Sequence, residues 1–362
     1  PEATLLPGEQ STVVYPNNQQ PGTPWYHDHA MGITRLNVMM GMAGFYLLVD
    51  SVETALGLPS GPYQIGLAIQ DRTLRANGSI VYPANWEEHF FGDKAVVNGK
   101  VWPYLKVNQG KYRFRMLDGS TSRTYTLHLS NGAPFVVIGT EGGMLPAPTT
   151  VTSLTLTPGE RADVIIDFAP YPAGTEILLT NTAPAPFPAG MPGEQPALPQ
   201  IMKFIVQGQP GHTAPIPGSL RPVEALDEAD ASVVRDLVLA KTPGGPCGGG
   251  AQWTINGLGF HDIREFPVLD STEIWQFINR SGVTHPMHMH LTMFQILDRQ
   301  SFVVSNDSII PVGPRVPPLP EEAGWKDTAA VPPNTIVRVI TRFEDYTGRF
   351  PYHCHILEHE EN

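Results

Sequence analysis

The chain has 362 residues, of which 41% are hydrophobic, and its 23 basic against 35 acidic side chains give a net charge of −12. This length allows two or three domains with a sizeable core in each, and the acidic balance argues against a nucleic-acid or anionic-membrane partner. The 35 glycines and 37 prolines suit short strands joined by many turns, rather than long helices or disorder. The longest apolar run, residues 38–49, is too short to span a bilayer.

The first segment with a clear pattern is PGEQSTVVYPNNQQPGTPWYHDHAMG, residues 7–32. A proline turn precedes apolar alternation at Val13 and Tyr15, which predicts a strand. A glycine-containing loop then leads to a second predicted strand that carries His27 and His29.

The same arrangement recurs in residues 158–181 and 332–355, which indicates an internal repeat. When the copies are aligned on their loop glycine, the first contributes His27, Asp28 and His29, the second Leu179, Thr180 and Asn181, and the third His353, Cys354 and His355. The first and third copies therefore carry candidate metal ligands, the second does not, and only the third carries a thiol.

The other half of the repeat occurs twice, in residues 98–129 and 256–290. Apolar alternation at Tyr112, Phe114 and Met116 against arginines predicts a half-buried strand. Alignment of the two copies places Thr124, Leu127 and Leu129 opposite His285, His288 and His290. The middle copy again lacks ligands, and the many short strands with turn signals predict Greek-key sandwiches or barrels.

This repeat predicts three domains in an all-β chain, the first of them incomplete. We expect residues 1–52 to be the C-terminal half of domain 1, 53–208 to be domain 2 without ligands, 209–230 to be a linker and 231–362 to be domain 3. The linker prediction depends on the proline-rich, acidic composition of residues 212–230. The missing half of domain 1 would carry a further His-x-His pair.

Eight of the twelve histidines lie in three short clusters: His27 and His29; His285, His288 and His290; His353, His355 and His359. Successive side chains of a strand point to opposite faces, so Cys354 faces away from its two histidine neighbours. By the same parity, His285 faces away from the other two histidines of its cluster. One strand would then serve a histidine-only site and a second site of His285, Cys354 and His359, a donor set typical of copper.

Zinc also takes His and Cys ligands, but neither HExxH nor CxxC spacing occurs, so zinc is the weaker hypothesis. The isolated histidines are expected in ordinary surface or core roles: His89, His128, His212 and His261. Cys247 lies in a glycine-rich loop and is expected as a free thiol. With Cys354 interpreted as a ligand, no disulfide framework is predicted, and the compartment stays open.

Five segments together resemble the three-domain multicopper oxidases, especially spore-coat-type bacterial laccases, phenoxazinone synthase and bilirubin oxidase: WYHDHAMGITRLN, NGKVWPYLKV, GWKDT, HPMHMH and HCHILEH. The resemblance covers nearly the whole chain. It implies tandem cupredoxin-like Greek-key β-sandwiches and a set of copper cofactors of types 1, 2 and 3.

Residue by residue, the resemblance implies that type 1 copper is bound by His285, Cys354 and His359, type 2 copper by His288, and the type 3 pair by His27, His29, His290, His353 and His355. Glu360 resembles an acidic residue assigned to proton delivery. The family's first His-x-His motif and its axial methionine have no counterpart here. Both would fall outside the two ends of the sequence, so we expect a fragment that lacks the N-terminal part and the extreme C-terminus.

The implied function is oxidation of phenols or aminophenols coupled to four-electron reduction of dioxygen to water. Cys354 is covalently contiguous with His353 and His355, which would give electrons a short route between the sites. The candidate catalytic residues are therefore Cys354, for electron transfer, and Glu360, for proton delivery. Three alternatives remain: an inactive copper-binding fragment, a copper nitrite reductase, which the ligand-free middle repeat disfavours, and a cuprous or other metal oxidase of the same family. Met39, Met40 and Met42 are interpreted as core packing rather than a methionine-rich metal site.

Overall fold

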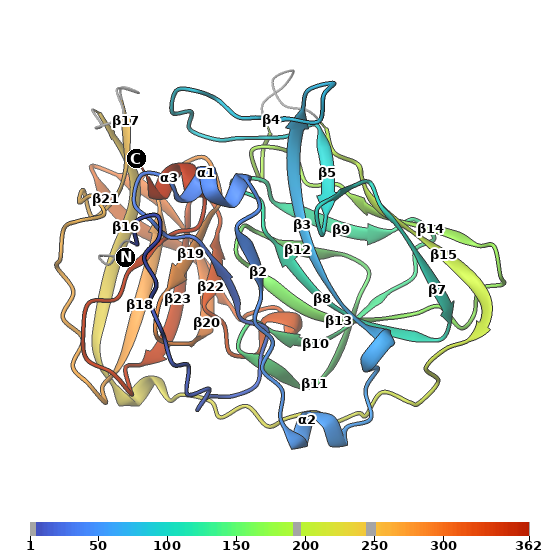
Figure 1. The fold of residues 1–362 in the computed structure, drawn as a ribbon. Coiled ribbons are helices and arrows are strands. Elements are labelled where there is room, and N and C mark those ends of the chain that lie inside the picture. The colour runs from blue at the N-terminus through green and yellow to red at the C-terminus, as the bar shows by residue number, and fades with distance from the viewer. Residues whose placement is uncertain (1–4, 191–196, 244–250, 362) are drawn as a thin grey trace.

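The computed structural model describes residues 5–190, 197–243 and 251–361, and strands dominate its regular structure (Figure 1). Two β-sandwiches lie side by side, with the N-terminal segment and two short helices packed where they meet. The all-β prediction is confirmed. Cys247 lies outside the described residues, and Cys354 is a free thiol. No described helix is long and apolar enough to cross a membrane.

One sandwich is built from residues that follow the N-terminal segment. Its larger sheet has the order β11-β10-β13-β8-β3-β5-β6, with β4 paired to β3. These strands are β3 (Gln64–Leu74), β4 (Ile80–Val81), β5 (Lys94–Val97), β6 (Lys100–Val101), β8 (Lys111–Asp118), β10 (Phe135–Thr140), β11 (Gly143–Val151) and β13 (Arg161–Asp167). The facing sheet, in the order β12-β9-β14-β15-β7, contains β7 (Tyr104–Gln109), β9 (Tyr125–Leu129), β12 (Leu154–Leu156), β14 (Glu176–Asn181) and β15 (Gln200–Pro210).

The core of this sandwich is apolar where the repeat lacks ligands: Leu127, Leu129 and Leu179 are all buried in it. Strand β8 is buried on both faces, so the prediction of a half-buried strand is wrong. The face that carries Arg113 and Arg115 is covered by α2 (Ser51–Ala55). Both guanidinium groups are paired there with carboxylates, which is how buried charge is tolerated.

The other sandwich is formed by the C-terminal part of the chain. Its six-stranded sheet, in the order β17-β16-β18-β23-β20-β21, contains β16 (Ala231–Pro243), β17 (Ala251–Ile255), β18 (Thr272–Asn279), β20 (Phe294–Ser305), β21 (Ser308–Val316) and β23 (Thr335–Arg342). The three-stranded sheet, in the order β22-β19-β24, contains β19 (His285–Met289), β22 (Thr328–Val331) and β24 (Tyr352–Cys354). Met287, Phe277 and Val337 lie in the core between these sheets, and α3 (Leu357–Glu360) follows β24 directly.

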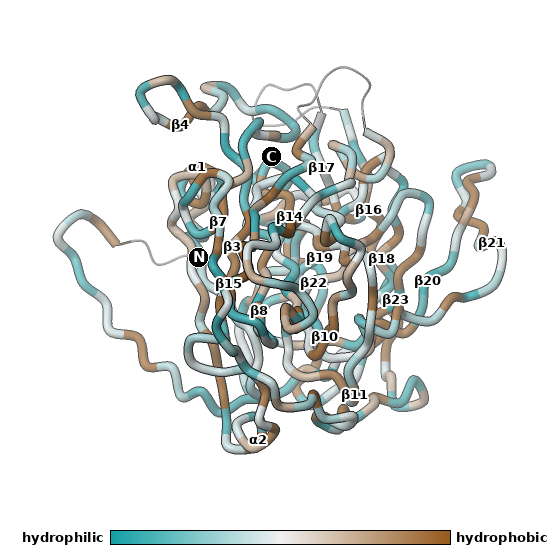
Figure 2. The backbone as a smooth tube through the Cα atoms, turned by 90° about the vertical axis from the view of Figure 1, so that its right-hand side faces the viewer, coloured by the Kyte–Doolittle hydropathy of each residue, from teal (hydrophilic) through white to brown (hydrophobic). Residues whose placement is uncertain are grey.

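The N-terminal segment forms a two-stranded sheet of β1 (Trp25–His27) and β2 (Ala43–Phe45), joined through α1 (Thr34–Met39). The strand predicted at Val13 and Tyr15 is absent: this stretch is exposed, and no described strand pairs with it (Figure 2). Alternation alone does not make a strand when the backbone groups find no partner. The prediction for the methionines is partly wrong as well, because Met39 is buried whereas Met40 and Met42 are exposed.

Residues 211–230 connect the two sandwiches and run along one edge of the molecule (Figure 1). They contain little regular structure before the short helix η2 (Glu228–Asp230). The remaining short helices are η1 (Gly61–Tyr63) and η3 (Pro320–Glu322). The division into domains at residues 52, 208 and 230 stays a prediction.

Candidate metal centre

Strand pairing of β19 with β24 organises the candidate ligands. In this antiparallel pair Met287 lies opposite Cys354, and His288 lies opposite His353. Because side chains alternate along each strand, one face presents the thiol and the other presents imidazoles. His290 follows the last paired residue of β19, and His355 follows the last paired residue of β24. His359 lies in α3, directly after β24.

The thiol face holds a compact group of three side chains, which we call the thiol site: His285, Cys354 and His359. The Cys354 Sγ atom lies 3.3 Å from His285 Nδ1 and 3.7 Å from His359 Nδ1. Burial lowers the pKa of His285 to about 3 and that of His359 well below its usual value, whereas it raises the pKa of the Cys354 thiol. Without a metal the site therefore contains two neutral imidazoles and a protonated thiol.

The opposite face holds six imidazoles, which we call the histidine cluster: His27, His29, His288, His290, His353 and His355. His353 Nε2 lies 3.3 Å from His29 Nε2 and 3.1 Å from His290 Nε2. The ring centroid of His288 lies 5.6 Å from that of His355. The first and last histidine motifs are thus brought together from positions 324 residues apart in the chain.

Backbone carbonyls fix the protonation of several of these rings. His27 Nδ1 lies 2.7 Å from the Asp28 carbonyl, and His288 Nδ1 lies 2.8 Å from the Asp327 carbonyl. A carbonyl only accepts, so each Nδ1 carries the proton and each Nε2 keeps its lone pair free for another partner. Burial lowers the pKa of His27 to about 4 and also lowers the pKa values of His353 and His355.

These observations fit bound metal ions. Several Nε2 lone pairs converge on one another, and His355 Nδ1 is buried without a hydrogen-bond partner. Neutral imidazoles turned toward each other repel unless a proton or cation lies between them. A cavity of about 350 Å³ borders the cluster and gives access to it from the side of Trp25 and Leu291.

The sandwich formed by β3 to β15, which we call the middle sandwich, supports the histidine cluster from the other side. Gly159 adopts φ +86°, and a Cβ atom there would lie 2.8 Å from the His355 ring. Arg161 of β13 forms a buried ion pair with Asp327, 2.5 Å between Nη2 and Oδ2, while Asp327 itself accepts from His288 through its carbonyl. The two sandwiches are therefore joined at the cluster by close packing and by buried charge.

Glu360 lies beside the histidine cluster at the end of α3. Its Oε1 is 3.3 Å from His29 Nδ1, and its Oε2 is 3.2 Å from His353 Nδ1. Burial, reinforced by the neighbouring Glu361, raises the pKa of Glu360 well above its usual value. A carboxyl group in this position can hold a proton next to two of the imidazoles.

Three neighbours of these sites were not predicted from the sequence. His89 lies with its Nε2 3.2 Å from His359 Nε2, and the Trp253 ring stacks on His359 at 4.2 Å between centroids. Asp327 belongs to the GWKDT segment, whose resemblance to the family was its only signal. His89 stands alone in the sequence, so only the fold brings it to the thiol site. Among the described residues, His128, His212 and His261 belong to no group of metal-binding atoms.

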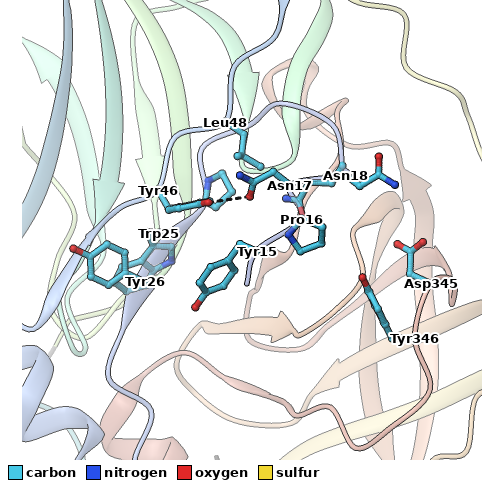
Figure 3. Close-up of a pocket in the computed structure, with 12 residues that line it drawn as sticks. Tyr15, Pro16, Asn17, Asn18, Trp25, Tyr26, Tyr46, Leu48, Asp345 and Tyr346 are labelled. Carbon is cyan, nitrogen blue, oxygen red and sulfur yellow. Dashed lines mark hydrogen bonds between the residues drawn. The ribbon is translucent and has the colours of Figure 1, made fainter. Parts of the chain in front are cut away.

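A second cavity, of about 450 Å³, is lined mainly by aromatic and amide side chains of the N-terminal segment (Figure 3). Tyr46 donates a hydrogen bond to Asn17 within it. Trp25 links this cavity to the histidine cluster, because its ring lies 4.5 Å from that of His27 and 5.4 Å from that of His355.

Comparison with known proteins places this chain in a family. Three family models, each described as multicopper oxidase, match residues 1–53, 74–178 and 250–362. A laccase of Bacillus subtilis is 40% identical over 96% of this chain and 70% of its own length. The chain belongs to the multicopper oxidase family. Multicopper oxidase LPR1 of Arabidopsis thaliana is 33% identical over 98% of this chain and 68% of its own length.

Solved structures agree. The McoA multicopper oxidase of Aquifex aeolicus matches 95% of this chain and 74% of its own with a TM-score of 0.78 and 31% identity. This multicopper oxidase is thus a copper-dependent, laccase-like oxidoreductase with the cupredoxin-like fold, and type 1, 2 and 3 copper centres are standard for the family.

Proposed function

We propose that this multicopper oxidase oxidises small phenols or aminophenols one electron at a time and passes the electrons to dioxygen. In this assignment His285, Cys354 and His359 bind type 1 copper. His288 binds type 2 copper, and the type 3 pair is bound by His27, His29, His290, His353 and His355. The residues present fit copper because a soft thiol with two imidazoles lies beside an all-imidazole group.

One observation carries the proposal: Cys354 belongs to the thiol site, while both of its chain neighbours belong to the histidine cluster. A single strand of three residues therefore connects the two candidate centres by covalent bonds. Copper bound at the thiol site would accept single electrons, and copper bound at the cluster would reduce dioxygen to water. The protein's own contribution is to hold these centres at a fixed separation in buried surroundings.

Reduction of dioxygen to water also needs protons. Glu360 is the proposed donor, because its two carboxyl oxygens lie within 3.3 Å of imidazole nitrogens of His29 and His353. Burial of Glu360 favours the protonated acid, so the group carries a proton when dioxygen arrives. The remaining imidazoles of the cluster are kept neutral by burial, as metal ligation requires.

One relative supports phenols as the class of electron donor. A laccase-like oxidase of Ochrobactrum, 26% identical with a TM-score of 0.78, is described with activity towards lignin model compounds and lignosulfonate. Phenolic groups are a common feature of such donors, and a multicopper oxidase with a net charge of −12 is better suited to neutral or cationic donors than to anions.

The test is to load the protein with copper and measure absorption and oxygen consumption together. We expect an intense blue thiolate-to-copper absorption and uptake of one dioxygen for every four phenol molecules oxidised, without release of peroxide. Protein treated with a copper chelator is the control and should show neither signal. A copper-loaded protein with no blue absorption and no oxygen uptake would contradict the proposal.

A further inference from the structure

The two imidazoles of the thiol site are held in matching ways. Each turns Nδ1 toward the Cys354 sulfur and Nε2 outward. For His285 the outward Nε2 lies 2.8 Å from Ser281 Oγ, and that hydroxyl donates its own proton to the Val283 carbonyl. Ser281 Oγ therefore accepts from His285, which fixes the proton on Nε2 and leaves Nδ1 free.

For His359 the outward partner comes from the other sandwich. His89 Nε2 lies 3.2 Å from His359 Nε2, and the two rings are nearly perpendicular, with an interplanar angle of 69°. Two imidazole nitrogens at this distance need one proton between them. If His359 keeps Nδ1 free for a metal, its Nε2 donates, and His89 must accept at Nε2 and carry its own proton on Nδ1.

The loop that presents His89 is tied to the thiol-site sandwich by several contacts. Tyr82 donates to the Glu358 carboxylate at 2.8 Å, and the Trp86 indole donates to the Glu358 carbonyl at 2.8 Å. Glu88 is paired with Lys241 of β16, 2.8 and 2.9 Å from its two oxygens. The Phe91 ring stacks on His89 at 5.6 Å. These anchors on both sides hold the imidazole of His89 in place.

His89 is half-buried whereas His359 is buried, so the loop lies between the thiol site and solvent. Glu88, His89 and His359 also bring three metal-binding atoms within 4.8 Å of one another. A separate metal ion is disfavoured there, because Lys241 already neutralises the Glu88 carboxylate and His359 is directed at the thiol. A hydrogen-bonding role for His89 explains the geometry without a further ion.

We infer that His89 is a positioning residue of the thiol site: it accepts the outward N–H of His359 and so fixes the tautomer and ring orientation of that ligand. This role rests on the proposed copper assignment of the thiol site. Partners of this kind orient metal-binding histidines and increase their basicity, and their loss typically lowers metal affinity about 10- to 100-fold.

The first test needs no metal. Nitrogen-15 NMR of the histidine side chains in the metal-free protein should show His359 protonated at Nε2 and His89 protonated at Nδ1. A His89 ring protonated at Nε2 would overturn the inference, whatever the protein does with copper.

The second test titrates cupric ion into three variants and follows the thiolate-to-copper absorption and its reduction potential. His89→Leu should require about 10- to 100-fold more free copper for half occupancy, shift the absorption band and raise the potential. His89→Gln, whose amide oxygen still accepts, should stay close to the unchanged protein. His128→Gln is the matched control, since in the described part of the chain the His128 ring bonds to Thr152 and Thr182 of the middle sandwich, away from the thiol site.

The outcomes separate the two proposals. If the unchanged protein shows no thiolate absorption with copper, the proposed function fails, while the NMR result still decides the role of His89. If copper binds normally and a folded His89→Leu variant keeps the affinity, band and potential of the unchanged protein, the role of His89 is contradicted and the proposed function stands.

Discussion

The thiol site and the histidine cluster lie on opposite faces of the same strand, yet they are assembled differently. All three members of the thiol site come from residues 285–359 and are closed off by a loop of the middle sandwich. The histidine cluster takes two members from the N-terminal segment and borders an open cavity. In the proposed function, the electron-accepting site thus takes its ligands from one sandwich, whereas the ligands of the dioxygen site come from two parts of the chain.

The strongest test of this difference removes a histidine that contacts both the N-terminal segment and the C-terminal sandwich. His353→Gln replaces the imidazole that faces His29 and His290. We expect oxygen uptake to fall to background while the blue absorption and its reduction by a phenolic donor persist, because Cys354 and its partners are untouched. Stopped-flow absorption and an oxygen electrode measure the two halves separately. Loss of the blue absorption in this variant would show that the two sites are not independent.

A second test uses pH. Burial raises the pKa of the Cys354 thiol and lowers the pKa values of His285 and His27 to about 3 and about 4. Between pH 6 and 8 metal binding must displace a proton from the thiol but not from these imidazoles. Copper affinity of the thiol site should therefore rise about tenfold per pH unit, and that of the histidine cluster much less. Calorimetric titration at several pH values measures both slopes, and equal slopes would contradict the difference in protonation.

A third test weakens the buried Arg161–Asp327 ion pair, which lies beside the histidine cluster and not beside the thiol site. Asp327→Asn leaves Arg161 buried without its carboxylate, so we expect a loss of about 3–5 kcal/mol in unfolding free energy. Copper affinity of the cluster should also fall, because the Asp327 carboxylate, 3.5 Å from His288 Nδ1, also helps to orient that ring. Asp163→Asn is the matched control: it weakens the buried pairs with Arg113 and Arg115, which among the described residues contact no histidine. Equal effects of both variants on copper binding would refute the specific role of Asp327.

The smallest effect is expected at a glycine that packs on the cluster. Gly159→Ala places a Cβ 2.8 Å from the His355 ring and also adopts an unfavourable φ of +86°. Gly174→Ala, with φ +88° and open space around it, has the backbone strain alone, about 1 kcal/mol. Denaturant unfolding should show a larger loss for Gly159→Ala, and only that variant should disturb cluster spectra. Identical behaviour of the two variants would mean that the His355 contact has no influence.

Much of the candidate site follows from the sequence because strand parity is a local property. Alternation around Cys354 and around His288 places ligands on two faces, and the repeat explains why leucines replace them in the middle sandwich. The residues that cover a strand face come from distant parts of the chain, so a local pattern does not predict them. The burial of Arg113 depends on α2, and the position of His89 depends on a contact between residues 270 apart in the chain.

The same reason accounts for the wrong predictions in the N-terminal segment. Val13 alternates like a strand residue, but no described strand offers it hydrogen bonds, and Met40 lies in an apolar run that the fold leaves exposed. Periodicity predicts which side chains share a face, and only tertiary contacts decide whether that face is buried.

The most direct test of the central claim, that one strand joins an electron-accepting site to a dioxygen-reducing site, is made on Cys354→Ser. The copper-loaded variant is reduced either with a phenolic donor or with dithionite and then mixed with dioxygen. We predict no blue absorption and no reduction by the phenol, but normal reoxidation after dithionite, because the histidine cluster is intact. Rapid reduction of the cluster by the phenol in this variant would contradict the account.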